Sequence, residues 1–240
     1  MPMIWFYPAP RGRRRRPMKA TVLLGTVGAL TLAGLAQATP FQGFTIESLG
    51  NTGNGETYRM YVNLDDGARI DAVFGNSVGN LSIGTQDGMN FYQNPLGGNT
   101  SLSINNGFFP LAPSLEWDSY VSVGALYADG TPFGNNALMD IGIDFGSFEA
   151  GGTLATDNGS WFVTPVDPQG EELNGMVFIG QFTVIGGSGD GVADLTGQIS
   201  LQGKDSAGVT WQELGVTWVP APGALALLGF AGLAGRRRRR

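Results

Sequence analysis

The chain alternates apolar and polar residues in short runs that are separated by turn-forming residues. In residues 57–64, the apolar side chains of Tyr58, Met60, Val62 and Leu64 occupy alternate positions. A period of two residues is typical of a strand with one buried face. The pattern therefore predicts a strand at 57–64 with these four side chains in the core, followed by a turn at residues 65–67.

Similar alternation recurs along the middle of the chain, and no convincing helical period interrupts it. The predicted alternating strands cover residues 69–74, 121–127, 139–145, 195–202 and 209–214. The run 176–185 is apolar on both faces and predicts a central strand. Residues 94–106 and 164–174 are the longest predicted loops. With ten to twelve strands and no crossover helices, we expect an all-β fold, an antiparallel β-sandwich or jelly-roll-like domain.

Charge is distributed very unevenly along the 240 residues. Eleven of the 14 Lys and Arg residues lie near the two ends, whereas all 20 Asp and Glu residues lie between them. Only Arg59, Arg69 and Lys204 oppose those acids, so this middle part carries a net charge of −17. Such a charge repels nucleic acids and anionic membranes. Nucleic acid is therefore not an expected partner.

The chain contains no cysteine and no histidine. Disulfides, thiol nucleophiles, Ser-His-Asp triads and the commonest transition-metal ligands are thereby excluded. The remaining polar groups are carboxylates, amides and hydroxyls, which suit hard cations such as calcium.

Residues 1–38 predict an N-terminal extension and a signal helix for export. A basic stretch is followed by an uncharged apolar run over residues 20–36, and Ala36 and Ala38 are the small residues that a signal peptidase accepts before its cleavage site. We expect cleavage after Ala38. An uncleaved membrane anchor is the alternative. Met18 and Lys19 directly precede the apolar run, so translation from Met18 would also give an ordinary signal peptide.

Residues 219–240 consist of three consecutive parts. An apolar run at residues 223–235 separates a proline-containing tetrapeptide from an arginine cluster. The run would be about 20 Å long as a helix, shorter than the hydrocarbon core of about 30 Å, so it spans a membrane only with help from its flanks. The tetrapeptide is Val219, Pro220, Ala221 and Pro222, and the cluster is Arg236, Arg237, Arg238, Arg239 and Arg240.

This tripartite tail resembles the PEP-CTERM sorting signal of exported bacterial proteins, in its VPxP-type variant. The resemblance covers about 22 residues and is reinforced by the signal peptide. It implies recognition by an exosortase, cleavage near the proline motif, and transfer to the cell surface or extracellular matrix after a transient stay at the membrane. Family members often accompany exopolysaccharide and biofilm genes. Ala221 stands where the name-giving motif has Glu, which leaves the exosortase subtype open, and a plain C-terminal anchor is the alternative.

Paired carboxylates are the candidates for enzymatic chemistry. Asp140 and Asp144 would lie on one face of a strand about 13 Å apart, which is too far for glycoside hydrolysis. Glu116 and Asp118 would lie about 6.6 Å apart in an extended segment, which that reaction allows. The competing interpretation is an acidic loop anchored in the core by Trp117.

Two further candidates concern binding. Asp190 and Asp194 lie in a Gly-rich segment that resembles part of a calcium loop, although it lacks the regular donors of an EF-hand; a hairpin turn explains it equally well. The aromatic pairs 91–92, 108–109 and 161–162 could stack on sugar rings, but most aromatic side chains of such a domain belong to the core.

Taken with the resemblance, these features predict three parts: residues 1–38, an acidic domain at 39–218, and the sorting signal at 219–240. We expect a non-enzymatic surface or matrix protein that acts by adhesion or by association with extracellular polysaccharide. Signal peptidase and exosortase would be its partners during export, and no cofactor is expected unless calcium binds. The alternatives are a secreted carbohydrate-active enzyme and a structural coat component.

Overall fold

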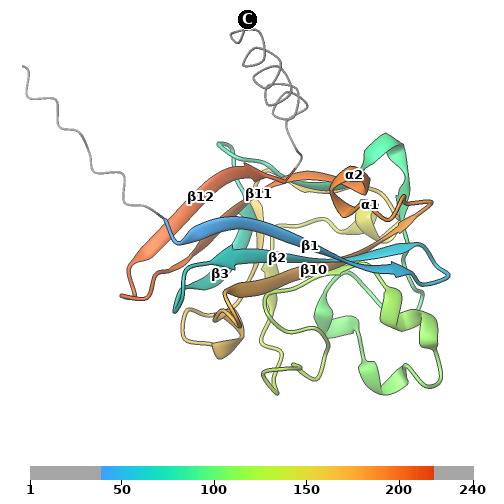
Figure 1. The fold of residues 1–240 in the computed structure, drawn as a ribbon, viewed down its shortest axis with the longest axis horizontal. Coiled ribbons are helices and arrows are strands. Elements are labelled where there is room, and N and C mark those ends of the chain that lie inside the picture. The colour runs from blue at the N-terminus through green and yellow to red at the C-terminus, as the bar shows by residue number, and fades with distance from the viewer. Residues whose placement is uncertain (1–38, 219–240) are drawn as a thin grey trace, which may run out of the picture. The chain divides into compact units, whose positions relative to one another are not determined.

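The computed structural model describes residues 39–218, which form two antiparallel β-sheets (Figure 1). The first sheet contains β1 (Phe41–Asn51), β2 (Glu56–Leu64), β5 (Asn90–Phe91), β6 (Tyr120–Val121) and β10 (Met176–Ile185). The second contains β3 (Arg69–Gly75), β4 (Leu81–Thr85), β7 (Met139–Ile141), β8 (Leu154–Thr156), β9 (Gly159–Phe162), β11 (Leu195–Lys204) and β12 (Thr210–Thr217). The predicted all-β class and antiparallel pairing are confirmed.

Helices are short throughout the described residues. The α-helices are α1 (Gly146–Glu149) and α2 (Gly191–Asp194), and the 3₁₀ helices are η1 (Gln86–Gly88), η2 (Ser101–Ser103), η3 (Asn106–Phe108), η4 (Pro113–Trp117) and η5 (Pro168–Gly170). Within residues 39–218, none of these helices has the length and apolar character that crossing a membrane requires.

One long strand organises each sheet. In the first sheet, β10 pairs with β2 along nearly its whole length and with the short strands β6 and β5 on its other edge. In the second, β11 pairs with β12 on one edge and with β4 and β3 in succession on the other. The prediction of a central strand at 176–185 is therefore confirmed, and its eight inner residues are all buried, as a doubly covered strand requires.

The two sheets share one hydrophobic core. On β2, the side chains of Tyr58, Met60 and Val62 are completely buried, as their alternation predicts. The second sheet contributes Trp161 of β9 and Leu201 of β11 to the same cluster. This shared core gives the domain a sandwich-like arrangement.

The predicted turn after β2 is present but connects two sheets instead of closing a hairpin. Ala68 donates a main-chain hydrogen bond to Asp65 at 3.1 Å, and Gly67 has φ +74°. The left-handed φ is accessible to glycine without the steric cost of a Cβ. Since β2 and β3 lie in different sheets, this turn transfers the chain across the core.

Two strand predictions were wrong in extent. Strand β6 ends at Val121, and the residues after it follow a loop path although Val123 and Ala125 are completely buried. Strand β7 ends at Ile141, which is 67% exposed, so the apolar face expected from the alternation of 139–145 is not a core face there. In residues 121–127 the alternation reflects the burial of loop residues, and in residues 139–145 it begins in a short edge strand. Neither arrangement requires two strands that pair over a long distance.

The longest irregular segment runs from residue 92 to residue 119, well beyond the loop predicted at 94–106. It contains η2, η3 and η4 and forms a second hydrophobic cluster with the first sheet. In that cluster, Ile104 and Leu115 of the segment pack with Tyr120 and Phe178 of the sheet. Leu115, which is completely buried, therefore anchors the acidic loop, whereas Trp117 is half-buried.

The predictions for the signal and sorting segments fall outside the described residues. They concern Ala36 and Ala38, the tetrapeptide Val219–Pro222 and the arginines at 236–240.

Candidate functional site

A polar cleft of about 350 Å³ lies beside the beginning of the long irregular segment. Its walls come from the loop after β5 and from the end of α1, and its lining residues are Gln93, Asn94, Pro95, Gly97, Gly98 and Glu149. The Nε2 atom of Gln93 is buried and has no hydrogen-bond partner within residues 39–218. A buried amide donor without a partner costs free energy.

The wall of this cleft is fixed by Asp118, which is completely buried. One carboxylate oxygen accepts hydrogen bonds from the main-chain N–H groups of Asn94 (2.7 Å) and Ser119 (3.0 Å), and the other accepts one from Gly98 (3.0 Å). A Cβ added at Gly97 would lie 1.8 Å from the carboxylate. The loop can therefore approach Asp118 only because residue 97 is glycine.

Burial raises the pKa of the Asp118 carboxyl to about 6, and the three main-chain hydrogen bonds only partly oppose that shift. The carboxylate is turned into the protein, with both oxygens accepting main-chain donors. Its neighbour Glu116 is half-buried on η4, and its main-chain oxygen accepts a hydrogen bond from Gln181. The geometry thus gives Asp118 a structural role in shaping the loop.

The pair Asp140 and Asp144 does not lie on one strand, contrary to the expectation. Strand β7 ends at Ile141, and Gly142, with φ +71°, turns the chain before Asp144. The Asp144 carboxylate then accepts a hydrogen bond from the main-chain N–H of Gly146, the first residue of α1.

Asp190 and Asp194 both hold the Gly-rich segment in shape. Asp190 caps α2 by accepting hydrogen bonds from the main-chain N–H groups of Val192 (3.0 Å) and Ala193 (3.3 Å). Asp194 is 2% exposed and accepts hydrogen bonds from the main chain and hydroxyl of Ser188, both at 2.7 Å, and from the hydroxyl of Tyr58. Within residues 39–218, no three acidic side chains are grouped so as to hold a metal ion.

These contacts shift the pKa values of both Tyr58 and Asp194. Burial, followed by the hydrogen bond to Asp194, raises the pKa of Tyr58. Burial works against ionisation of Asp194 as well, but the hydrogen bonds from Tyr58 and Ser188 prevail and lower its pKa. Asp194 is therefore an ionised acceptor that ties the start of β11 to β2.

The aromatic pairs divide between core and surface. Phe91 is 2% exposed and packs edge-on against Phe148, with 5.4 Å between ring centroids. Trp161 is completely buried, and its indole N–H donates to the Ser122 carbonyl at 2.9 Å. Phe108, by contrast, is 52% exposed. The core interpretation holds for Phe91 and Trp161.

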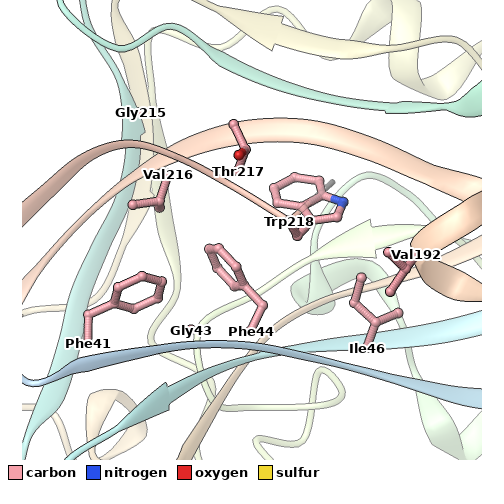
Figure 2. A pocket seen from close by; sticks show the side chains of 9 residues that line it. All are labelled: Phe41, Gly43, Phe44, Ile46, Val192, Gly215, Val216, Thr217 and Trp218. Carbon is pink, nitrogen blue, oxygen red and sulfur yellow. The ribbon is translucent and has the colours of Figure 1, made fainter. Parts of the chain in front are cut away.

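An apolar groove of about 440 Å³ separates the outer strands β1 and β12 (Figure 2). Within residues 39–218, β1 pairs only with β2, and β12 pairs only with β11. The Phe44 ring lies between Phe41 and Trp218, with edge-on centroid distances of 5.2 and 5.7 Å. At the end beyond Trp218, Ile46 of β1 faces Val192 of α2.

Both ends of the described residues lie beside this groove. The hydroxyl of Thr39 donates a hydrogen bond to the Glu213 carboxylate on β12, and Phe41 begins one wall. Trp218 is 8% exposed in the groove, and its indole N–H has no acceptor within residues 39–218. No sequence pattern indicated this groove, because its walls come from opposite ends of the domain.

Comparison of this chain with protein-family models, with curated proteins and with solved structures found no match.

Proposed function

We propose that this chain is an exported, non-enzymatic cell-surface or extracellular-matrix protein that an exosortase-type system sorts. The observation that carries the proposal is that the described domain ends at the residue before the proline motif. Strand β12 ends at Thr217, and Trp218 packs against Phe44, one residue before the Val219–Pro222 motif. Cutting at or after the motif would leave all the strands of the two sheets whole, since the last of them ends at Thr217.

The two expected processing points lie beside the same groove, towards its two ends. Thr39 follows the predicted signal-peptidase site and contacts Glu213, while Trp218 precedes the sorting motif. Before processing, both membrane-directed segments would therefore leave the domain at the groove. Signal peptidase and then exosortase would both cut beside this groove.

The sorting step can be tested by comparing the full chain with a variant that ends at Trp218. Both are produced with residues 1–38 in cells that contain an exosortase. We expect the full chain to lose its C-terminal segment and to reach the surface or medium in a shortened form, whereas the truncated variant shows no second size change. Unchanged size and membrane location of the full chain would refute the proposal.

For the exported domain, we propose association with extracellular polysaccharide through the polar cleft. The exposed carboxylate of Glu149 and the amide side chain of Gln93 line the cleft, and both are groups that bind sugar hydroxyls. The net charge of −17 would keep the domain away from anionic surfaces unless divalent cations bridge them. We also assign the two sheets to the jelly-roll-like class of sandwiches, on the support of their shared core and antiparallel pairing.

The mature form recovered from cells can be tested on a glycan array. Gln93→Ala should weaken binding about tenfold, since it removes a hydrogen bond of about 1.5 kcal/mol. Glu149→Gln replaces a charged acceptor with a neutral one and should weaken binding by about threefold to tenfold. Asp157→Asn, an exposed site with the same change in charge as Glu149→Gln, is the control and should bind like the wild type. Equal binding by all variants would remove the cleft from the proposal.

The same material distinguishes the alternatives. Release of reducing ends that is lost in Glu116→Gln would indicate a carbohydrate-active enzyme, and self-assembly without glycan binding would indicate a coat component. Calcium at Asp190 and Asp194 stays a prediction, which calorimetric titration checks. Absence of both binding heat and a thermal shift would reject it.

A further inference from the structure

The outer face of the first sheet carries a row of polar side chains that the main hydrophobic core does not use. Strands β1, β2 and β10 lie side by side in this sheet (Figure 1). Since Tyr58 and Met60 are buried in the core between the sheets, Arg59, which lies between them on β2, faces outward. Its cross-strand neighbours are Glu47 on β1 and Gln181 on β10. One cation therefore stands between an acid and an amide on this face.

The surrounding fold fixes the orientation of the Arg59 guanidinium. Its Nε donates a hydrogen bond to Oε1 of Gln181 at 3.2 Å, and its Nη2 donates one to the hydroxyl of Tyr127 at 3.0 Å. Gln181 is completely buried, and its Nε2 donates to the main-chain oxygens of Glu116 (2.8 Å) and Asp118 (3.0 Å). These two bonds direct the Gln181 oxygen at Arg59, so the guanidinium is held along one edge.

The guanidinium has no counter-ion in the described part of the chain. Within residues 39–218, ion pairs are formed by Arg69 and not by Arg59. Glu47 lies opposite Arg59, but its carboxylate accepts a hydrogen bond from the hydroxyl of Tyr61 at 3.2 Å instead. Arg59 is half-buried, and a charge that is partly removed from water without an opposite charge costs free energy. An anion that reached Arg59 would recover that cost.

The free part of the guanidinium matches a carboxylate. Nε and the nearer N–H of Nη2 form one edge, which Gln181 and Tyr127 occupy. The end of the group, with Nη1 and the second N–H of Nη2, is left for a further acceptor. Two parallel N–H groups of this kind hold both oxygens of a carboxylate at once.

Tyr127 adds a hydroxyl donor beside this end. Burial raises the pKa of Tyr127, so the hydroxyl keeps its proton at neutral pH. A hydroxyl that accepts a hydrogen bond can still donate its own proton, so Tyr127 can serve Arg59 and a ligand together. The ring packs edge-on against Phe109, with 5.2 Å between centroids, which fixes the position of the hydroxyl.

A small hollow of about 140 Å³ shares its walls with this site. One wall is Tyr61, which lies two residues after Arg59 on the same face of β2, and another is Leu126, which adjoins Tyr127. Phe178 packs against Tyr61, with 5.6 Å between ring centroids, and also lines the hollow. Pockets for drug-sized ligands have volumes of about 300 Å³ or more, so this one suits a single ring-sized group.

We propose that Arg59 binds the carboxylate of an acidic sugar, a uronate unit of a polysaccharide, whose ring occupies the hollow beside Tyr61. The site is separate from the polar cleft, and the inference rests on the proposed function in one respect, the choice of a sugar as the ligand. Because the surrounding domain is acidic, the site would hold isolated uronate units in preference to densely charged chains.

Calorimetric titration of the full chain, purified in detergent, with sodium glucuronate tests the site. We expect saturable binding that Arg59→Gln weakens by about tenfold or more, because the substitution removes a bidentate charged donor. Lys204→Gln makes the same change in charge on β11 of the second sheet and should bind like the wild type. The difference between these two variants separates the site from the arginines near the ends of the chain.

A second variant should strengthen binding. Glu47→Gln removes the carboxylate opposite Arg59, so the affinity for glucuronate should rise by about threefold, a gain that unfolding cannot produce. Glucose, which has no carboxylate, and acetate, which has no ring, should each bind about tenfold more weakly than glucuronate. Melting curves verify that the variants fold.

Equal binding of glucuronate by the wild type and Arg59→Gln would overturn the proposal, as would glucose that binds as tightly as glucuronate. Acetate that binds as tightly would replace the sugar with a bare carboxylate, and tighter binding of a short polyglutamate peptide would replace it with an acidic protein. If Arg59→Gln has no effect while Gln93→Ala still weakens binding on the glycan array, this site alone is rejected. The reverse result rejects the polar cleft alone.

Discussion

Replacing Asp118 with asparagine should change how the stability of the domain depends on pH. The carboxyl group is completely buried, and burial raises its pKa to about 6 from the ordinary value of 3.8. The folded protein therefore binds this proton more tightly than the unfolded chain does. The stabilisation from protonation is complete below pH 3.8 and is lost as the pH rises through about 6.

The size of the effect follows from these two pKa values. Between pH 7.5 and pH 5, protonation of Asp118 is expected to stabilise the folded state by about 1.4 kcal/mol. For a domain of this length, that change corresponds to a rise of about 3 to 6 °C in Tm.

Few other groups should change their protonation between pH 5 and pH 7.5. The chain contains no histidine, and the pKa values of Asp129, Glu172 and Asp194 are lowered, which moves their titration further below it. Asp129 and Glu172 owe this chiefly to main-chain hydrogen bonds. The dependence of stability on pH between 5 and 7.5 should therefore come mainly from Asp118.

The assay is thermal unfolding of the mature form at pH 5, 6 and 7.5, followed by circular dichroism. Asp118→Asn cannot titrate and satisfies fewer main-chain donors, so it should be less stable by about 1 to 3 kcal/mol at pH 7.5 and show a flat profile. Asp157→Asn, an exposed site, should keep the wild-type rise on acidification. The reasoning is refuted if wild-type Tm does not rise from pH 7.5 to 5, or if Asp118→Asn retains the same rise.

Three other substitutions test contacts that organise the core and the groove. Tyr58→Phe removes the hydroxyl that donates to Asp194 and should cost about 1 to 2 kcal/mol in urea unfolding; unchanged stability would mean that the bond contributes nothing. Trp161→Phe leaves a cavity and an unpaired main-chain carbonyl, for an expected loss of about 2 to 4 kcal/mol, and a smaller loss than for Tyr58→Phe would contradict its central place in the core. Gly197→Ala forces a Cβ to 2.4 Å from the Trp218 ring and should both destabilise the domain by about 1 to 3 kcal/mol and change its tryptophan fluorescence, whereas an unperturbed spectrum would show that the ring does not lie there.

Much of the sheet architecture could be predicted from local pattern. The alternation in β2 identified its buried face, and the uninterrupted apolar run of β10 identified a strand covered on both faces. Both inferences worked because each strand is long and pairs along most of its length, so the burial of its side chains follows directly from the period of the backbone. The extents of β6 and β7 were missed because buried loops and edge strands can show the same local alternation.

The candidate sites were less accessible to local reasoning. Spacing suggested that Asp190 and Asp194 could bind calcium and that Glu116 and Asp118 could form a catalytic pair, but spacing does not show which donors a carboxylate faces. The fold directs main-chain N–H groups at Asp118 and the Tyr58 hydroxyl at Asp194. The only sequence signal for the hydrogen bonds around Asp118 was the pair Gly97 and Gly98. Glycine is needed at residue 97 because a Cβ there would clash with the Asp118 carboxylate.

The sequence by itself determined the all-β class, the acidic middle part and the exclusion of thiol and imidazole chemistry, because composition and a period of two residues are local properties. Only the tertiary structure decided that Phe41 and Trp218 form one groove and that Asp118 is buried behind a polar cleft. Those features depend on which strands become edges and which segments cover a sheet. Long-range packing sets both, and it leaves no local period in the chain.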